Sequence, residues 1–504
     1  MRTREEFIEG LKKMKPNVWM GGEKVRRDDP RFQPSINVLG VTFDLANDPR
    51  YEKLFTATSH LTGKKINRFN HIMLTPEDLL KKQMMIRVGC HRVAGCIQRC
   101  MGQDTINALY RITYEIDQKH GTHYHKNFVE WLKYFQENDL VGSAAQTDPK
   151  GDRSKRPHEQ ADPDVYLRVV EKRKDGIIVR GAKIHNTIAP QADEIIAIPT
   201  RVLVEGEEDY AVAFAVPGDW DGVKIINHQA SVRPRKQWDA PIAHIGVSDG
   251  FVVFDDVFVP WERVFMCGER EFGGPLALQF AFNHRHSYTG CKPAVSDIIM
   301  GSAALVAEYN GTERVSHIRE KISDLIGVAE LVYSAGVASA IFSIKTPSGF
   351  CAPNPIYVNV GRRHAGHNIY HEYDILADIA GGIPATLPYE EDFLNPETKP
   401  FLEKYLKRKA DIPVEDQHRC IRMLSDMLCS GWAGVWQVAG VHGGGSPMME
   451  TVAILGNYPI QARKEIAKYL AGIKSKDEFE NEVEVKGVNE FLESIKKVFG
   501  EKSK

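Results

Sequence analysis

Cysteine and histidine side chains that could share one metal centre lie in two segments far apart in the chain. Cys96 and Cys100 are four residues apart in GCHRVAGCIQRCMG, and His284 and Cys291 follow much later in FNHRHSYTGCK. Three thiols and one imidazole would supply the four ligands of one iron–sulfur cluster. For that to happen, the fold must bring these two segments together. This is the strongest constraint that the sequence places on the tertiary structure.

The same four residues fit two other interpretations. A structural zinc ion also accepts three thiolates and one imidazole, although zinc folds usually pair their ligands in short knuckles. Taken singly, the Cys96 and Cys100 pair and His284 are more typical of a buried core than of a ligand set. The chain has eight cysteines, and in an intracellular protein of this length we do not expect disulfides.

Composition and charge exclude some classes of function. The chain has 504 residues and a net charge of −2, so neither nucleic acid nor an anionic membrane surface is expected as its main partner. We see no apolar run long enough to span a bilayer and no signal peptide in MRTREEFIEGLKKMK. We therefore predict a cytoplasmic protein.

The order of hydrophobic patterns predicts an α+β protein with helices on both sides of a β region. The expected regions are an N-terminal helical domain, a mostly antiparallel middle β domain that binds flavin, a C-terminal helical domain and a charged tail. Their boundaries are 1–140, 141–275, 276–473 and 474–504.

Local signals place the first cysteine pair and one hairpin. Thr75 followed by Pro76 is typical of a helix start, and the helical pattern continues to about residue 138, with breaks near Gly102 and Gly121. Cys96 and Cys100 are therefore expected on one helix, where residues four apart share a face. The Asp175–Gly176 pair between two β-rich runs predicts a hairpin.

This organisation resembles the acyl-CoA dehydrogenase type of flavoprotein, in which flavin lies between the β domain and the C-terminal helices. Specific motifs resemble the 4-hydroxybutyryl-CoA dehydratase and vinylacetyl-CoA delta-isomerase family, within the 4-hydroxyphenylacetate 3-hydroxylase superfamily. These motifs include GCIQRCMG, TDPKGDR, VRGAKIHNT, HRHSYTGCK, DIAGG and HGGGSP. The resemblance extends to about Ile473 and leaves only the charged tail uncovered.

The resemblance implies a homotetramer with one FAD and one [4Fe–4S] cluster per subunit. Cys96, Cys100 and Cys291 match the family's thiolate ligands, and His284 matches its histidine ligand. The positions that match polar active-site residues of the family are Gln98, Thr187, Tyr288 and Lys292.

The reaction implied by the resemblance is the removal of water from a 4-hydroxyacyl thioester. The proton at C3 is very weakly acidic, so a simple general base would fail to remove it. The expected solution is a radical mechanism. The C2 proton leaves first, which gives an enolate. Flavin then accepts one electron, and the C3 hydrogen of the resulting enoxy radical becomes acidic. Finally the electron returns and hydroxide leaves C4, so there is no net redox change.

The resemblance also gives roles to residues one helical turn apart. We expect His284 to transfer protons, Tyr288 to donate to the departing hydroxyl and Lys292 to hold anionic charge, all on one helix face. Without the resemblance, Tyr288 would be interpreted as a packed core aromatic and Lys292 as a solvated surface residue.

Candidate flavin contacts lie in two further motifs. Thr147 and Lys150, in the loop QTDPKGDR, and Thr187 are expected to contact the isoalloxazine or pyrophosphate. Gly381 and Gly382 of DIAGG are expected to contact the adenosine half of FAD, including across a subunit interface. The alternative interpretations are an ordinary polar turn for the first motif and a helix C-cap for the second.

Two carboxylates of the family are altered in this chain. Where the family has a glutamate just before HGGGSP, this chain has Ala439, and where the family has a glutamate before FVVFDDVF, this chain has Asp249. Three interpretations follow. In the first, His284 performs all proton transfers. In the second, Asp249 or His442 replaces the missing acid. In the third, the protein is a paralogue that acts on another acyl-CoA or has isomerase activity only.

Two other classes of function stay open. A flavin-dependent aromatic monooxygenase would use reduced flavin and oxygen and would not need the cysteines or His284 as ligands. A zinc-stabilised scaffold protein would hold zinc and no flavin. Metal content and a visible spectrum distinguish all three classes.

Overall fold

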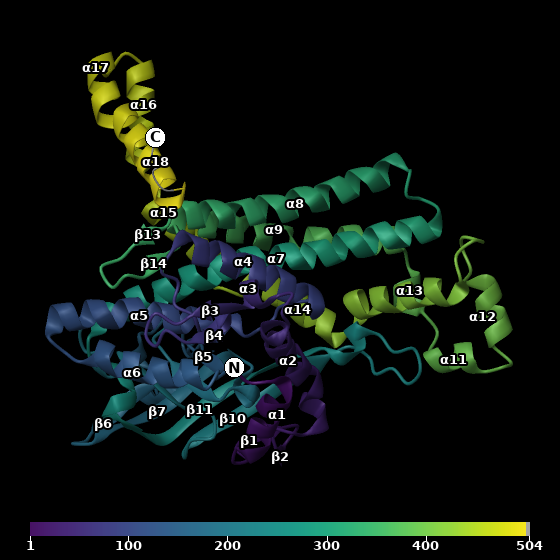
Figure 1. Cartoon of the computed structure of the whole chain (residues 1–504), viewed down its shortest axis with the longest axis horizontal. Helices are drawn as coiled ribbons and strands as arrows, with labels where there is room; N and C mark the ends of the chain where they lie inside the picture. Colours follow the sequence, from purple (N-terminus) through teal and green to yellow (C-terminus); the bar gives the residue numbers. More distant parts are fainter. Residues whose placement is uncertain (500–504) are drawn as a thin grey trace.

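The computed structural model describes residues 1–499 and places two β-sheets beneath a layer of long helices (Figure 1). The larger sheet has six strands in the order β2-β1-β10-β11-β7-β6. Its strands are β1 (Val18–Met20), β2 (Glu23–Val25), β6 (Arg168–Lys172), β7 (Gly176–Thr187), β10 (Val223–Ser231) and β11 (Gly246–Pro260). The protein is therefore a mixed helix-and-sheet structure, as expected.

The smaller sheet has four strands in the order β12-β9-β8-β5. Its strands are β5 (Gly142–Ala145), β8 (Glu194–Ala197), β9 (Val212–Pro217) and β12 (Val264–Cys267). The β6–β7 hairpin predicted at Asp175–Gly176 is confirmed, with Lys172 paired to Ile177. Most pairs are antiparallel, but β5 and β8 are parallel.

The N-terminal region is not wholly helical, because it contributes two strands to the larger sheet. After α1 (Arg4–Lys13), β1 pairs in parallel with β10, with Val18 opposite Ile225. These strands have only three residues each, too few for an alternating pattern to be visible in the sequence. The expected boundary at residue 140 stays a prediction.

The helices α4 to α6 include the segment that carries Cys100, and the helix start predicted at Thr75 is confirmed. Thr75 caps α4 (Pro76–Arg92), and its hydroxyl accepts from the backbone N–H of Asp78. The other two helices are α5 (Cys100–His120) and α6 (Tyr124–Glu137). The expected break near Gly121 is confirmed by the left-handed residue that ends α5.

The prediction that Cys96 and Cys100 share one helix is wrong. The chain leaves the helix after Arg92, and Cys96 lies in the connection before α5 begins at Cys100. Ala94 and Gln98 have left-handed φ values of 49° and 63° in this connection, and such values cannot continue a right-handed helix. The break that we expected near Gly102 therefore lies several residues earlier.

Three long helices form the upper layer. They are α7 (Gly273–Asn310), α8 (Ser316–Ile341) and α9 (Pro355–Ala380), and they pack against one another, with α4 and α5 against α7. By length and composition α8 could cross a membrane, which the sequence analysis did not anticipate. Its apolar residues, including the fully buried Leu325 and Val332, contribute to packing against α7 and α9.

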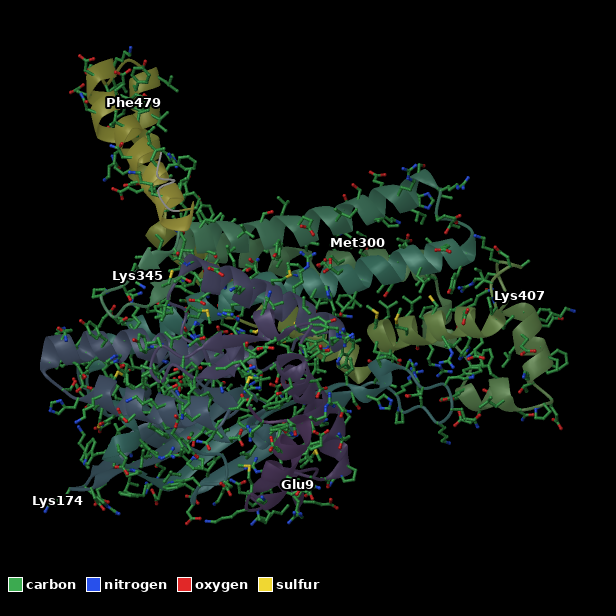
Figure 2. The ribbon with its side chains drawn as sticks, in the orientation of Figure 1. Glu9, Lys174, Met300, Lys345, Lys407 and Phe479 are labelled. Carbon is green, nitrogen blue, oxygen red and sulfur yellow. The ribbon has the colours of Figure 1, made fainter. Side chains whose placement is uncertain are left out.

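The last helices lie at the periphery. The tail, predicted as a peripheral helix, contains α17 (Lys476–Phe479) and α18 (Val485–Phe499). Together with α16 (Ile460–Leu470) they project from the long helices, and Phe479 lies near the far end of the projection (Figures 1 and 2). Residues 500–504 of the predicted tail lie outside the described residues.

Close contact between α4 and α7 fixes the distance between α4 and the helix that carries His284 and Cys291. A Cβ added at Gly290 would lie 2.4 Å from the carbonyl oxygen of Gln83 on α4. In the same helix, a Cβ at Gly301 would meet nothing within 4 Å. Only the first glycine is therefore required by packing.

These two glycines provide a matched test of this packing. We expect Gly290→Ala to lower the free energy of unfolding by about 1–3 kcal/mol, because the methyl group pushes α4 away from α7. We expect Gly301→Ala to raise it by up to about 1 kcal/mol, because alanine is the better helix former. Thermal unfolding of both variants measures the difference, and equal shifts would contradict the proposed contact.

Candidate functional site

Thiols from the α4–α5 connection and from α7 meet in the interior. Hydrogen bonds from the thiols of Cys100 and Cys291 lower the pKa of the Cys96 thiol well below its usual value, although burial opposes this. The backbone N–H of Gln98 also donates to the Cys96 sulfur at 3.3 Å. The structure therefore brings the three predicted sulfur ligands together, through a loop and two helices instead of one helical face.

A fourth thiol, which sequence reasoning did not select, lies in the same group. Cys90 on α4 is fully buried, and its hydrogen bond with Cys291 is the largest of the causes that raise the pKa of the Cys291 thiol. Buried cysteines are common in cores, so no sequence signal separates Cys90 from the other four cysteines that were interpreted as packing residues.

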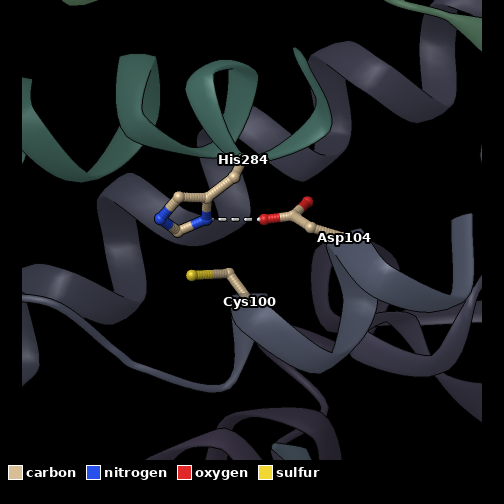
Figure 3. A group of neighbouring side chains, drawn as sticks. All are labelled: Cys100, Asp104 and His284. Carbon is tan, nitrogen blue, oxygen red and sulfur yellow. Dashed lines mark hydrogen bonds and ion pairs between the residues drawn. The ribbon is translucent and has the colours of Figure 1, made fainter. Parts of the chain in front are cut away.

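His284 is oriented by a buried carboxylate on α5 (Figure 3). Its Nδ1 lies 2.9 Å from Oδ2 of Asp104, whose side chain is fully buried. The ligand atoms of Cys100, Asp104 and His284 all lie within 4.8 Å of one another. A carboxylate on one ring nitrogen fixes the ring and leaves Nε2 for a metal or a proton, which is the usual arrangement of a metal-binding histidine.

Asp104 also has partners on α4 and α7. Lys82 donates to its Oδ1 at 2.5 Å, and the hydroxyl of Ser287 donates at 2.9 Å. Burial would raise the pKa of Asp104, but the charges of Lys82 and His284 outweigh it, so the pKa is lowered. Asp104 therefore accepts a hydrogen bond from Nδ1 of His284 and holds the ring in place.

The larger sheet supplies a second carboxylate beside the thiols. Asp249 on β11 lies opposite Thr187 on β7. Burial and the charge of Cys96 raise the pKa of Asp249, and its hydrogen bond with Thr187 opposes them. Two of the predicted polar residues, Thr187 and Asp249, are thus next to the sulfur group.

Gln98 connects the cysteine loop to the same strand. Its side-chain N–H donates to the carbonyl of Gly246 at the start of β11, at 3.1 Å. Its Oε1 is buried and has no hydrogen-bond partner among the described residues. A buried amide oxygen without a partner is costly, and it marks a place where a ligand could donate a hydrogen bond.

Tyr288 and Lys292 lie on α7 with His284, as the spacing predicts, but both already have partners. The Tyr288 hydroxyl donates to the carbonyl of Gly440 at 2.7 Å, and its buried ring lies 4.3 Å from the guanidinium of Arg362. Lys292 is buried and forms an ion pair with Glu372 on α9. Lys292 is therefore neither a solvated lysine nor a free cation.

The remaining predicted contacts lie outside this group. Thr147 and Lys150 line a surface cavity in the β region. Gly381 ends α9 and, like Gly382, is exposed, with nothing within 4 Å of an added Cβ. The N–H of Gly381 donates to the carbonyl of Ala377, which is the helix C-cap that the sequence left as the alternative.

The loop that follows α14 (Gly431–His442) lies close to His284. A Cβ at Gly444 would lie 3.5 Å from the ring of His284. Ala439 occupies the last turn of α14, where it accepts from the N–H of Gly443. The altered family position is thus close to the site in sequence and in space, with no carboxylate of its own.

A buried acid follows the same loop on α15 (Pro447–Asn457). Burial raises the pKa of Glu450, while the charges of Arg362 and Arg285 oppose the rise. Sequence reasoning missed Glu450, Glu372 and Asp104. Of these only Asp104 had a signal, because it lies four residues after Cys100, one turn along the same helix.

Comparison with known proteins identifies relatives over almost the whole chain. Residues 3–266 match the N-terminal part of 4-hydroxyphenylacetate 3-hydroxylase, and residues 274–472 match its C-terminal part. The chain is 40% identical to 4-hydroxybutyryl-CoA dehydratase/vinylacetyl-CoA-Δ-isomerase of Clostridium aminobutyricum, over 94% of this chain and 100% of that protein. It is 32% identical to the oxygenase component of 4-hydroxyphenylacetate 3-monooxygenase of Thermus thermophilus, over 86% and 89%.

Solved structures give the same result. An oxygen-tolerant archaeal 4-hydroxybutyryl-CoA dehydratase from N. maritimus has a TM-score of 0.89 and 38% identity, with 94% of this chain and 96% of that chain covered. The oxygenase component of 4-hydroxyphenylacetate 3-monooxygenase complexed with FAD has a TM-score of 0.85 and 28% identity, with 93% and 98% covered. The resemblance inferred from the motifs is confirmed.

The buried pair of Lys292 and Glu372 allows a direct test of its structural role. We expect Glu372→Gln to lower the free energy of unfolding by about 3–5 kcal/mol, because it leaves the Lys292 charge buried without a partner. The double variant Lys292→Met/Glu372→Gln is expected to recover most of this loss, since the unpaired charge is then absent. Chemical denaturation of the unaltered protein, Glu372→Gln, Lys292→Met and the double variant measures the coupling, and additive losses of stability would contradict it.

Proposed function

The chain belongs to the 4-hydroxyphenylacetate 3-hydroxylase family, and we propose that it dehydrates 4-hydroxybutyryl-CoA to crotonyl-CoA and isomerises vinylacetyl-CoA, with FAD and one [4Fe–4S] cluster. One observation carries this proposal. Cys96, Cys100, Cys291 and His284 come from distant segments to one buried place, where Asp104 orients the imidazole. A dehydratase/isomerase that shares 40% identity over its full length supports the substrate class.

The donor set fits an iron–sulfur cluster. Three soft sulfurs and one imidazole nitrogen match the ligands that such clusters accept. The lowered pKa of Cys96 favours the thiolate, which is the form that binds metal, and the carboxylate behind His284 fixes the orientation of its ring. Cys96, Cys100, Cys291 and Nε2 of His284 would hold the cluster. When bound, the cluster would supply a Lewis acid for the C4 hydroxyl, and FAD would supply one-electron chemistry.

The residues of the chain can then orient the substrate and move its protons. Asp104 fixes the His284 ring, so that Nε2 lies at a defined place, where it would transfer a proton only when it does not hold the cluster. Asp249 lies beside Thr187 with its pKa raised by burial, which suits a general base that must take a proton at neutral pH. We therefore assign to Asp249 the role that the family gives to a longer carboxylate.

The roles that the resemblance gave to Lys292 and Tyr288 need revision. Because Glu372 neutralises Lys292, we propose that Lys292 positions α7 against α9 and does not hold substrate charge. Because Tyr288 donates to the carbonyl of Gly440, it must release this bond before it can donate to a departing hydroxyl. Thr187, next to Asp249, is kept as a proposed flavin contact.

The position of the flavin, the number of subunits and the cellular location are also proposed. We propose an acyl-CoA-dehydrogenase-like arrangement in which flavin lies between the β region and the C-terminal helices, in a cytoplasmic homotetramer. Exposed apolar side chains on the helix layer, including Leu331 at 61% and Tyr370 at 53% exposure, support burial of this layer by other subunits.

An aromatic monooxygenase is the second candidate function. The relatives that carry this activity share 32% identity or less with the chain over most of its length. Such an enzyme would have no use for a converging set of three thiols and an imidazole. A paralogue that only isomerises is the third candidate, and it is favoured by Ala439 at the position of the missing acid.

Removal of one thiol tests the cluster. We expect protein purified without oxygen to contain iron, sulfide and FAD with a broad visible absorbance, and Cys96→Ser to lose most of its iron and all dehydratase activity. Cys429→Ser, which alters an exposed cysteine, is the control and should keep both. Zinc in place of iron, or full iron content in Cys96→Ser, would contradict the proposal.

Parallel assays with 4-hydroxybutyryl-CoA and vinylacetyl-CoA then decide the substrate range. Activity on both substrates supports the dehydratase. Activity on vinylacetyl-CoA alone identifies an isomerase and implicates Ala439.

The Asp104 carboxylate can be tested separately from activity. We expect Asp104→Asn to lower the affinity for the cluster by about 10–100-fold, because the His284 ring loses the acceptor that orients it. Iron content after timed exposure to a chelator is the readout, with thermal unfolding as the control for folding. Iron retention equal to that of the unaltered protein would rule out this role.

A further inference from the structure

The end of α14 and the loop after it present carbonyl groups to buried side chains of α7 and α9. The hydroxyl of Tyr288 donates to the carbonyl of Gly440 at 2.7 Å. The Nη2 of Arg362 on α9 donates to the carbonyl of Val441 at 2.7 Å, and its Nε donates to that of Gly443 at 2.8 Å. Carbonyls in the last turn of a helix have no partner within the helix, so these side chains supply the donors that α14 lacks.

Arg362 joins this loop to the ring of Tyr288. The guanidinium lies over that ring, 4.3 Å from its centre, and its counter-ion is Glu450 on α15, 3.4 Å from its Nε. A guanidinium is a rigid planar fork that binds through several N–H groups and also stacks on aromatic rings. One side chain of α9 therefore fixes both the loop and the tyrosine.

The loop that Arg362 holds lies against His284. A Cβ added at Gly444 would lie 3.5 Å from Cδ2 of the His284 ring and 3.5 Å from Nε of Arg362. Cδ2 is bonded to Nε2, the nitrogen that we propose as a cluster ligand. Gly444 has a left-handed φ of 84°, which glycine adopts without strain, and Arg285 donates to its carbonyl at 3.0 Å. The position of the loop therefore decides how closely the backbone covers the ligand side of His284.

The pair of Arg362 and Glu450 is a costly way to fill this part of the interior. Their side chains have 0% and 1% exposure. Among residues 1–499, Nη1 of Arg362 and Oε1 of Glu450 have no hydrogen-bond partner. Apolar side chains of similar volume are often as stable as a buried ion pair, or more stable. Stability alone therefore does not account for Arg362, whereas its hydrogen bonds to the loop give it a specific role.

We propose that Arg362 is a positioning residue for the reaction: it holds the loop of residues 443–445 over the Nε2 side of His284 and fixes the Tyr288 ring against the end of α14. This inference rests on the proposed function, because that function gives His284 and Tyr288 their roles. Arg362 acts through these two side chains and does not itself contact the substrate. Loss of the guanidinium should loosen the loop, so that His284 and Tyr288 are less precisely placed.

A charge-balanced variant removes the guanidinium without leaving Glu450 unpaired. In hydrogen-exchange mass spectrometry of the holoenzyme, we expect Arg362→Met/Glu450→Gln to speed amide exchange in residues 440–446 by about tenfold or more, because the loop opens more easily. Iron release to a chelator should be faster by about tenfold. The kcat for vinylacetyl-CoA should fall by about tenfold or more with KM changed less than about twofold, because positioning affects the transition state more than binding.

Arg362→Lys separates the charge from the geometry. Lysine keeps a cation beside Glu450 but lacks the planar fork that binds two carbonyls and stacks on Tyr288. We expect this variant to change the unfolding temperature by only about 3 °C and yet to show the faster loop exchange and the lower kcat. Full activity of Arg362→Lys with slow loop exchange would show that only the charge matters, and would overturn the inference.

A second variant displaces the guanidinium without deleting it, in case the charge-balanced variant does not fold. A Cβ added at Gly366 on α9 would lie 2.5 Å from Nη1 of Arg362. A Cβ added at Gly327 on α8 would meet nothing within 4 Å. Gly366→Ala should therefore speed loop exchange and lower kcat, and Gly327→Ala should do neither. Slow loop exchange and full kcat in Gly366→Ala would contradict the proposed role.

The neighbouring arginine provides the matched control. Arg363 lies on the same helix and donates to Oγ1 of Thr451 on α15 at 2.7 Å, not to the loop. Arg363→Met should leave loop exchange, iron release and kcat unchanged. Equal effects of the Arg362 and Arg363 variants would reduce Arg362 to general packing of α9 and overturn the inference.

The remaining outcomes separate the inference from the proposed function. If the unaltered protein is active and the Arg362 variants keep its loop exchange and iron retention, the inference fails and the proposed function stands. A looser loop with unchanged kcat also overturns the inference. If the unaltered protein turns over neither 4-hydroxybutyryl-CoA nor vinylacetyl-CoA, the proposed function fails, and the role of Arg362 in that reaction fails with it.

Discussion

The buried carboxylate of Asp104 is the interaction on which the arrangement of the site depends. It joins Lys82 of α4 to His284 and Ser287 of α7, while its own helix, α5, begins with Cys100. A buried carboxylate without partners would be strongly destabilising, so the three helices must dock in one relative position to satisfy it. That position also brings the thiols of the α4–α5 connection to Cys291.

Several elements of the fold could be predicted from local signals, and the family resemblance predicted that Cys96, Cys100, Cys291 and His284 lie together. Thr75 before Pro76 gave a helix start, and Asp175–Gly176 gave a hairpin, and the structure has both. The connection around Cys96 could not be predicted, because Ala94 and Gln98 adopt left-handed backbone conformations that neither residue type indicates. Long-range pairs leave no local pattern either, and Lys292 and Glu372, eighty residues apart, are an example.

The structure also limits how the altered carboxylates can be replaced. Glu450 is buried and close to Ala439 in sequence, but Arg362, 3.4 Å away, compensates its charge. Among residues 1–499, Asp249 forms no ion pair, and burial and the charge of Cys96 raise its pKa. A group that must accept a proton is better suited to this role without a permanent counter-ion. Of the two acids, Asp249 fits this role better.

The separation of the ligands has a consequence for biogenesis. Asp104 and His284 are 180 residues apart in the chain, and strands β5 to β12 are synthesised between them. Long-range contacts form slowly because the intervening loop must close first. A nascent chain therefore cannot complete the proposed ligand set before α7 has docked, so binding of a cluster there would report the completion of the tertiary structure.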